Sequence, residues 1–173
     1  MRLMALTKAA LLATLALAPA AAQQPGSRQT REFIKAAGEA DTFEIMEAYT
    51  ALAQSSDPQI IAFAHQMIQS HGETGRQLRA AAERAGLEPP SNGINTGQSP
   101  FLAALQSLRG REFDKAYWKQ QALAHRSALI VAQAYASTGD APVIREAAAS
   151  AVPIIQSHLA MAEQMLSKLE GGP

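Results

Sequence analysis

The apolar positions of this chain recur with the spacing of amphipathic helices. From about residue 30 onward, apolar side chains return every three or four positions, which places them on one face of a helix. These segments are rich in alanine, leucine, glutamate, glutamine and arginine, and no alternating run of β-branched residues competes with that preference for helix. The pattern predicts four long helices, over about 30–55, 58–85, 111–137 and 141–169.

Proline, glycine and turn-forming residues separate these helices. Asp57-Pro58 and Ser99-Pro100 each have the pattern of a capping residue followed by the first residue of a helix. The segment 87–98 has turn chemistry throughout and predicts a loop, and 99–108 predicts a short helix in the same connection. The pattern leaves open whether this long connection, over 86–110, crosses the bundle.

Pro153 falls inside the last helical pattern. The apolar spacing resumes after it, so we expect the proline to kink that helix rather than end it. Amphipathic helices of similar length with short first and third connections are typical of a bundle. The sequence therefore predicts an all-α protein whose four long helices pack around one core.

The first residues have the pattern of a signal peptide. Arg2 and Lys8 give a positive start, 9–18 is a short apolar run, and small residues up to Ala22 form a cleavage site. The apolar run is too short to span a bilayer, which needs about 20 residues. The expected organisation is a signal peptide over 1–22, a short linker over 23–30 and the bundle over 31–169.

Composition narrows the compartment and the partners. The chain has no cysteine, which excludes disulfides, thiolate ligands and cysteine nucleophiles. It carries 15 Lys and Arg against 15 Asp and Glu, and removal of the leader leaves a small acidic excess. We therefore expect no nucleic-acid partner. No stretch after the leader is uniformly apolar, so we expect no transmembrane segment in the mature chain. A periplasmic location is favoured, with secretion as the alternative, and a protein partner or a homodimer stays open.

Each predicted long helix places one ionisable residue at the centre of its apolar face. At about 100° per residue these are Glu44, His71, His125 and His158. At about 1.5 Å per residue each lies near the middle of its helix, so all four belong to one level of the core whichever way the helices run. Glu47 falls nearer the edge of its face.

Three neutral imidazoles and a carboxylate are a suitable ligand set for a transition metal. Zinc, iron, manganese or copper could bind to them, and bundle cores are a known place for such sites. Asp114 and Tyr117 are candidates for outer partners, and His65 points toward the polar side. The alternative is a buried Glu–His hydrogen-bond network without a metal. No phosphate loop, serine triad or HExxH helix indicates an enzyme.

Four stretches of the chain resemble the bacterial exported family known as domain of unknown function 4142. The resemblance covers about 31–167, and its stretches are FEIMEAYTALAQ, IIAFAHQMIQSHGETGRQL, LRGREFDKAYWKQQALAHRSAL and VPIIQSHLAMAEQML. Its most specific part is the set Gly110, Phe113, Asp114, Tyr117 and His125, joined by His71 and His158. The resemblance implies a ferritin-like four-helix fold, exported from the cytoplasm, and no particular activity.

The sequence departs from the usual iron site of ferritin-like proteins. Those proteins place an acid three residues before each liganding histidine, whereas Ile68, Ala122 and Ile155 occupy these positions here. A di-iron centre is therefore not predicted. Two hypotheses follow: a periplasmic metal-binding bundle involved in metal handling or stress protection, and a metal-free module that acts through its surface.

Overall fold

The computed structural model describes residues 26–170. The expected signal peptide and its cleavage near Ala22 lie outside these residues. The described part of the chain is helical and contains no strand. Its helices are α1 (Arg28–Gln54), α2 (Pro58–Arg84), α3 (Ser99–Ser107), α4 (Gly110–Thr138) and α5 (Pro142–Glu170). The four long helices agree with the predicted segments to within about two residues at each end.

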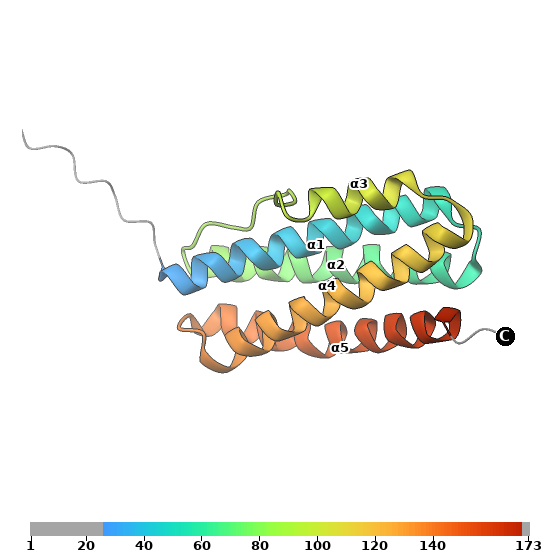
Figure 1. Ribbon diagram of the computed structural model, residues 1–173. Coiled ribbons are helices and arrows are strands. Elements are labelled where there is room, and N and C mark those ends of the chain that lie inside the picture. Colours follow the sequence, from blue (N-terminus) through green and yellow to red (C-terminus); the bar gives the residue numbers. More distant parts are fainter. Residues whose placement is uncertain (1–25, 171–173) are drawn as a thin grey trace, which may run out of the picture.

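The long helices form two antiparallel pairs, α1 with α2 and α4 with α5 (Figure 1). After α2 ends, the segment 85–98 and α3 carry the chain back along the length of the bundle, so α2 and α4 run in the same direction (Figure 1). The long connection therefore crosses the bundle, which settles the point that the sequence pattern left open. The fold is a ferritin-like four-helix bundle, as predicted.

Capping side chains set the starts of α1 and α2. Ser27 Oγ accepts a hydrogen bond from the backbone N–H of Thr30 at 3.1 Å, so α1 begins slightly earlier than the pattern predicted. Asp57 Oδ1 accepts from the backbone N–H of Gln59 at 2.7 Å, as expected for a cap before Pro58. Each bond satisfies a backbone donor that the first turn of a helix leaves without a partner.

The start of α3 differs from the prediction. Ser99 is the first helical residue rather than its cap, and Gln98 in the capping position makes no side-chain cap bond. Asn95 Oδ1 instead accepts from the backbone N–H groups of Gly97 and Gln98, at 2.9 and 3.0 Å. This local turn satisfies the donors ahead of the helix, so the serine is not needed there.

The helix α5 continues through Pro153, as expected. Proline removes one backbone donor and crowds the preceding turn, but Ala148 before it and Ile155 after it are buried. The packing of that face keeps the segment helical. The predicted kink stays a prediction.

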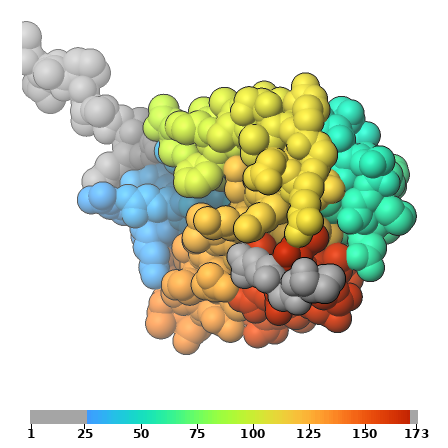
Figure 2. Space-filling view, turned by 45° about the vertical axis from the view of Figure 1, so that its right-hand side comes forward, coloured from blue at the N-terminus to red at the C-terminus, as the bar shows by residue number. Residues whose placement is uncertain are grey.

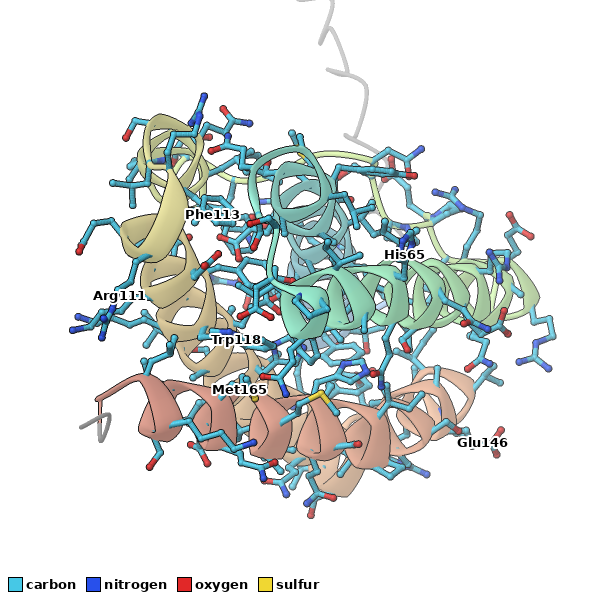
Figure 3. All side chains as sticks on the ribbon, turned by 90° about the vertical axis from the view of Figure 1, so that its right-hand side faces the viewer. His65, Arg111, Phe113, Trp118, Glu146 and Met165 are labelled. Carbon is cyan, nitrogen blue, oxygen red and sulfur yellow. The ribbon has the colours of Figure 1, made fainter. Side chains whose placement is uncertain are left out.

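Two apolar clusters fill the ends of the bundle. One includes Phe63, Trp118 and Met165, and the other includes Phe33, Leu78, Tyr135 and Ile144. Full burial of each large side chain contributes about 1.5–3 kcal/mol. Phe113, Trp118 and Met165 lie between the helices, whereas Arg111 and Glu146 point outward (Figure 3).

The polar residues at the helix centres lie between these two clusters. Along every long helix, residues of one cluster precede the central position and residues of the other follow it. The core is thus apolar at both ends and polar in its middle. Among the described helices, none combines the length and apolar character that a membrane span requires.

Candidate metal centre

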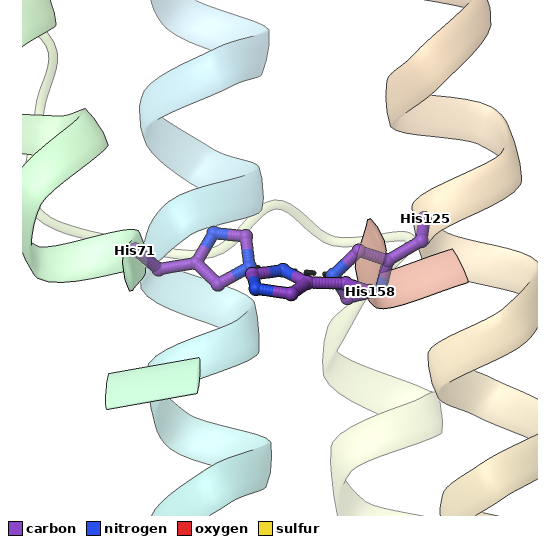
Figure 4. A group of neighbouring side chains, drawn as sticks. All are labelled: His71, His125 and His158. Atoms are coloured by element: carbon purple, nitrogen blue, oxygen red, sulfur yellow. Dashed lines mark hydrogen bonds between the residues drawn. The ribbon is translucent and has the colours of Figure 1, made fainter. Parts of the chain in front are cut away.

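Three histidines from three helices converge in the middle of the core. His71 comes from α2, His125 from α4 and His158 from α5, and one ring nitrogen of each lies within 4.8 Å of the other two (Figure 4). Their exposed fractions are 6%, 1% and 1%. The structure therefore brings together three of the four residues that the sequence pattern singled out.

Asp41 of α1 orients the ring of His71. Its Oδ1 lies 2.8 Å from Nδ1 of His71 and also accepts a hydrogen bond from Thr74 Oγ1 at 2.9 Å. Because an ionised carboxylate can only accept, the proton of the neutral ring is on Nδ1 and Nε2 carries the lone pair. Sequence reasoning missed Asp41, although it stands three residues before Glu44 and so shares that side of the helix.

A backbone carbonyl orients His125 in the same way. Nδ1 of His125 lies 2.9 Å from the carbonyl oxygen of Gln121, one helical turn earlier in α4. A carbonyl oxygen is also an acceptor only, so Nδ1 carries the proton here too. The lone pair of His125 is therefore on Nε2, which points into the core.

The two lone pairs face each other. Nε2 of His71 and Nε2 of His125 are 3.4 Å apart (Figure 4). When Nδ1 of each neutral ring carries the proton, neither Nε2 has a hydrogen to donate, and two lone pairs at this distance repel. A positive species between them, either a proton or a metal ion, removes that repulsion.

His158 completes the group from α5, the antiparallel partner of α4. Its ring centroid lies 5.2 Å from that of His125 and 5.5 Å from that of His71. Within the described residues, its buried Nδ1 has no hydrogen-bond partner. A buried nitrogen without a partner is unusual, so this ring has a nitrogen to spare for a ligand.

Burial disfavours the imidazolium form of all three rings, and it sets the direction of the pKa shift at two of them. It lowers the pKa of His125 to about 3, an effect to which the charge of His71 adds. It also lowers the pKa of His158 to about 3, assisted by the charges of the other two rings. At His71 burial acts downward as well, but the hydrogen bond to Asp41 and the negative charges of Glu44 and Asp41 outweigh it, so the pKa is raised.

Glu44, the fourth predicted ligand, faces a different side of the cluster. Its Oε1 lies 3.7 Å from Nδ1 of His125, the nitrogen that points away from the convergence. Its Oε2 accepts a hydrogen bond from Nε2 of Gln121 at 2.6 Å. Burial raises the pKa of Glu44 to about 7. The carboxylate is close to the histidines, but it is not among the converging ligand atoms.

Glu47 is fully buried, which corrects its expected place near the edge of the apolar face. Its Oε2 lies 2.8 Å from the same Nε2 of Gln121 that binds Glu44. Burial, and then the charge of Glu44, raise the pKa of Glu47 well above the ordinary value. Counting positions around α1 placed Glu47 wrongly because it takes no account of α4, which packs on that side of α1 and brings Gln121 to the carboxylate.

The remaining polar candidates lie apart from the histidines. Asp114 accepts a hydrogen bond from Ser55 Oγ at 2.7 Å near the ends of α1 and α4, so it joins these helices. Tyr117 is fully buried, and its hydroxyl has no partner among the described residues. His65 is exposed on the side of α2 that faces away from α5, as predicted (Figure 3).

The fold and the buried cluster define a ferritin-like four-helix bundle with a three-histidine core. Residues 15–165 match the protein family described as Domain of unknown function (DUF4142). Because the match spans most of the chain, the protein belongs to this family, as the sequence resemblance indicated. No curated protein matches the chain.

A solved structure shares the architecture. The crystal structure of a DUF305 fragment from Deinococcus radiodurans matches with a TM-score of 0.72, covering 83% of this chain and 99% of the fragment. The two sequences are 17% identical, so the likeness concerns the fold alone.

Proposed function

We propose that this protein binds one transition-metal ion in its core through His71, His125 and His158. The spacing of the first two ligand nitrogens is the observation that carries this assignment. Two nitrogens bound to one tetrahedral ion with bonds of about 2.0–2.1 Å stand roughly 3.3–3.4 Å apart. The two Nε2 atoms are separated by 3.4 Å, and both present lone pairs.

The donor set selects among metals. Imidazole nitrogens suit zinc, copper and iron, whereas manganese prefers oxygen ligands. Because Glu44 faces the outer nitrogen of His125, it does not add an oxygen to the set. We therefore expect manganese to bind weakest of the four metals that the sequence suggested. Three protein ligands also leave a position on a four-coordinate ion for an outside ligand.

Asp41 supports the centre from outside. A carboxylate hydrogen-bonded to the far nitrogen of a liganding histidine fixes the ring and makes it a stronger ligand. Asp41 has this relation to His71, and Thr74 holds the carboxylate in turn. It also supplies one negative charge beside the site, which partly offsets the burial of a divalent cation.

We further propose a compartment and a biological role for a protein with this metal site. The leader-like segment at the start of the chain favours export to the periplasm, with secretion as the alternative. One buried ion per chain suits metal handling or protection of the cell envelope under stress. Fractionation followed by immunoblotting tests the location, and the growth of a deletion strain under metal excess and depletion tests the role.

Metal stoichiometry tests the binding itself. Full-length protein is expected to bind one equivalent of zinc, copper or iron, measured by elemental analysis after titration and desalting. His71→Ala, His125→Ala and His158→Ala are each expected to lose at least 100-fold in affinity. His65→Ala is the matched control, because His65 is an exposed histidine on the same helix as His71. Circular dichroism verifies that the variants remain helical.

A metal-free bundle is the second candidate, and the raised pKa of His71 favours it. A doubly protonated His71 could donate an Nε2–H to the lone pair of His125 across the 3.4 Å between them. His71 and His125 would then be joined by a hydrogen bond without a metal, and the protein would act through its surface. Wild-type protein that carries no metal, and whose melting temperature ignores zinc, copper and iron, would support this candidate and contradict the first.

A further inference from the structure

A cavity leads from the surface to the histidines. It has a volume of about 340 Å³, lies between α1, α4 and α5, and reaches His71 and His125 at its inner end. Its outer part is lined by the first residues of α3, including Phe101, and by Leu123 of α4. Both of these apolar side chains are about half exposed, at 47% and 49%. Figure 2 shows the face on which α1, α3 and α4 meet.

Small side chains create this space. Three of the lining helices present alanines at helical spacing, so each turn contributes only a methyl group to the wall. The wall includes Ala37, Ala40, Ala128, Ala132, Ala147 and Ala151. The volume falls in the range of about 300–1,000 Å³ that is typical of small-molecule sites. For scale, an engineered apolar cavity of about 150 Å³ holds one benzene molecule.

The two ends of the cavity differ in polarity. Most of the wall is apolar. Asp41, Glu44, His71, Thr74 and His125 line the part nearest the convergence of the rings, and the remaining polar residues of the lining are Gln98, Gln120 and Ser127. Oδ1 of Asp41 and Oγ1 of Thr74 are engaged in hydrogen bonds, and so is Nδ1 of His71 and of His125. A mostly apolar wall that leads to the buried cluster of titratable residues suits a molecule with an apolar body and a polar head.

We propose that the cavity binds a small amphiphile, an apolar chain of roughly ten non-hydrogen atoms with a carboxylate head, and that this head ligates the metal. The inference rests on the proposed metal site. Without the ion, Asp41 and Glu44 would repel an anionic head in this buried setting. With the ion, the open coordination position gives the carboxylate a favourable partner, and the alanine wall takes the chain.

Calorimetric titration with carboxylates of increasing length tests whether the cavity binds the apolar part of the amphiphile. In zinc-loaded protein, affinity is expected to rise roughly fourfold per methylene from butyrate to octanoate. It is expected to stop rising for longer chains such as hexadecanoate, once the cavity of about 340 Å³ is filled. Octanoate is expected to bind metal-free protein at least tenfold more weakly than zinc-loaded protein, whereas neutral octanol binds both forms alike.

Two variants with one control test the wall. Ala128→Leu and Ala151→Leu each place three extra carbons in the cavity and are expected to weaken octanoate binding at least tenfold while zinc stoichiometry stays the same. Ala134→Leu is the control, because Ala134 is exposed on the same helix as Ala128. Two results would contradict the amphiphile site while leaving the metal site in place. In the first, zinc binds but octanoate binds no better than acetate. In the second, Ala128→Leu and Ala151→Leu bind octanoate as tightly as wild type. If no metal binds, both the amphiphile site and the metal site are wrong.

Discussion

Oδ1 of Asp41 and Nδ1 of His71 lie 2.8 Å apart across the interface of α1 and α2, and this contact decides which nitrogen of the ring faces the core. The carboxylate accepts a hydrogen bond from the protonated Nδ1, so the lone pair of the neutral ring is on Nε2, which faces His125. A residue on one helix thereby sets the chemistry of a residue on another.

We expect Asp41→Asn to weaken metal binding about 10- to 100-fold. The amide oxygen can still accept from Nδ1, but it lacks the charge that strengthens the imidazole as a ligand. Competition with a chelator of known affinity measures the change. Glu32→Gln is the control, because Glu32 is an exposed carboxylate on the same helix. Equal losses in the two variants would show a general effect of charge and would contradict a role for Asp41.

Glu44→Gln is expected to change how the stability of the metal-free protein depends on pH. The pKa of Glu44 is about 7 in the folded protein against an ordinary 4.5. Between these values the unfolded chain has lost a proton that the folded chain keeps, so the contribution of Glu44 to stability falls as pH rises from about 4.5 to about 7. Glutamine removes that loss.

Urea unfolding at pH 4.5 and pH 7.5 measures this effect. The stability of Glu44→Gln relative to wild type is expected to increase at the higher pH by on the order of 1–3 kcal/mol. His125 and His158 act in the other direction: their pKa values of about 3 stabilise the folded state as pH rises from about 3 to about 6.5. Both proteins share that contribution. Glu163→Gln on the exposed side of α5 is the control, and a pH-independent difference for Glu44→Gln would contradict the raised pKa.

Gly38 fixes the long connection against α1. A Cβ at this position would lie 2.4 Å from Cβ of Pro90, so Gly38→Ala is expected to push the connection away and destabilise the fold by about 1–3 kcal/mol. Gly72→Ala is the matched comparison, because its new Cβ meets only Nη1 of Arg76 at 3.6 Å. There the gain in helix propensity is expected to stabilise by up to about 1 kcal/mol. Urea unfolding that shows the same sign for both would contradict this account of the contact.

The height of the three histidines along the bundle could be predicted, because the position of a residue within a helix depends only on its place in the sequence. Counting about 100° and 1.5 Å per residue placed His71, His125 and His158 at the centres of their faces and at one height, which the structure confirms. The positions of side-chain atoms depended on neighbouring helices. Gln121 of α4 turns the carboxylate of Glu44 away from the converging nitrogens.

Asp41 and the course of the long connection could not be predicted for the same reason. Asp41 lies at the half-buried edge of α1, where the pattern of apolar residues gives no signal, and its importance follows from the partner on α2. The segment 87–98 has no periodicity, so its path depends on contacts such as that of Pro90 with Gly38. Both features arise from packing between segments far apart in sequence.

X-ray absorption at the metal edge of the loaded protein tests the three-histidine centre most directly. We expect three nitrogen neighbours at about 2.0–2.1 Å, with the outer-shell scattering of imidazole rings, and one further light atom at the open position. His158→Ala should lose one imidazole from that pattern, whereas His65→Ala should leave it unchanged. A coordination shell made mainly of oxygen, or protein that retains no metal after desalting, would contradict the assignment.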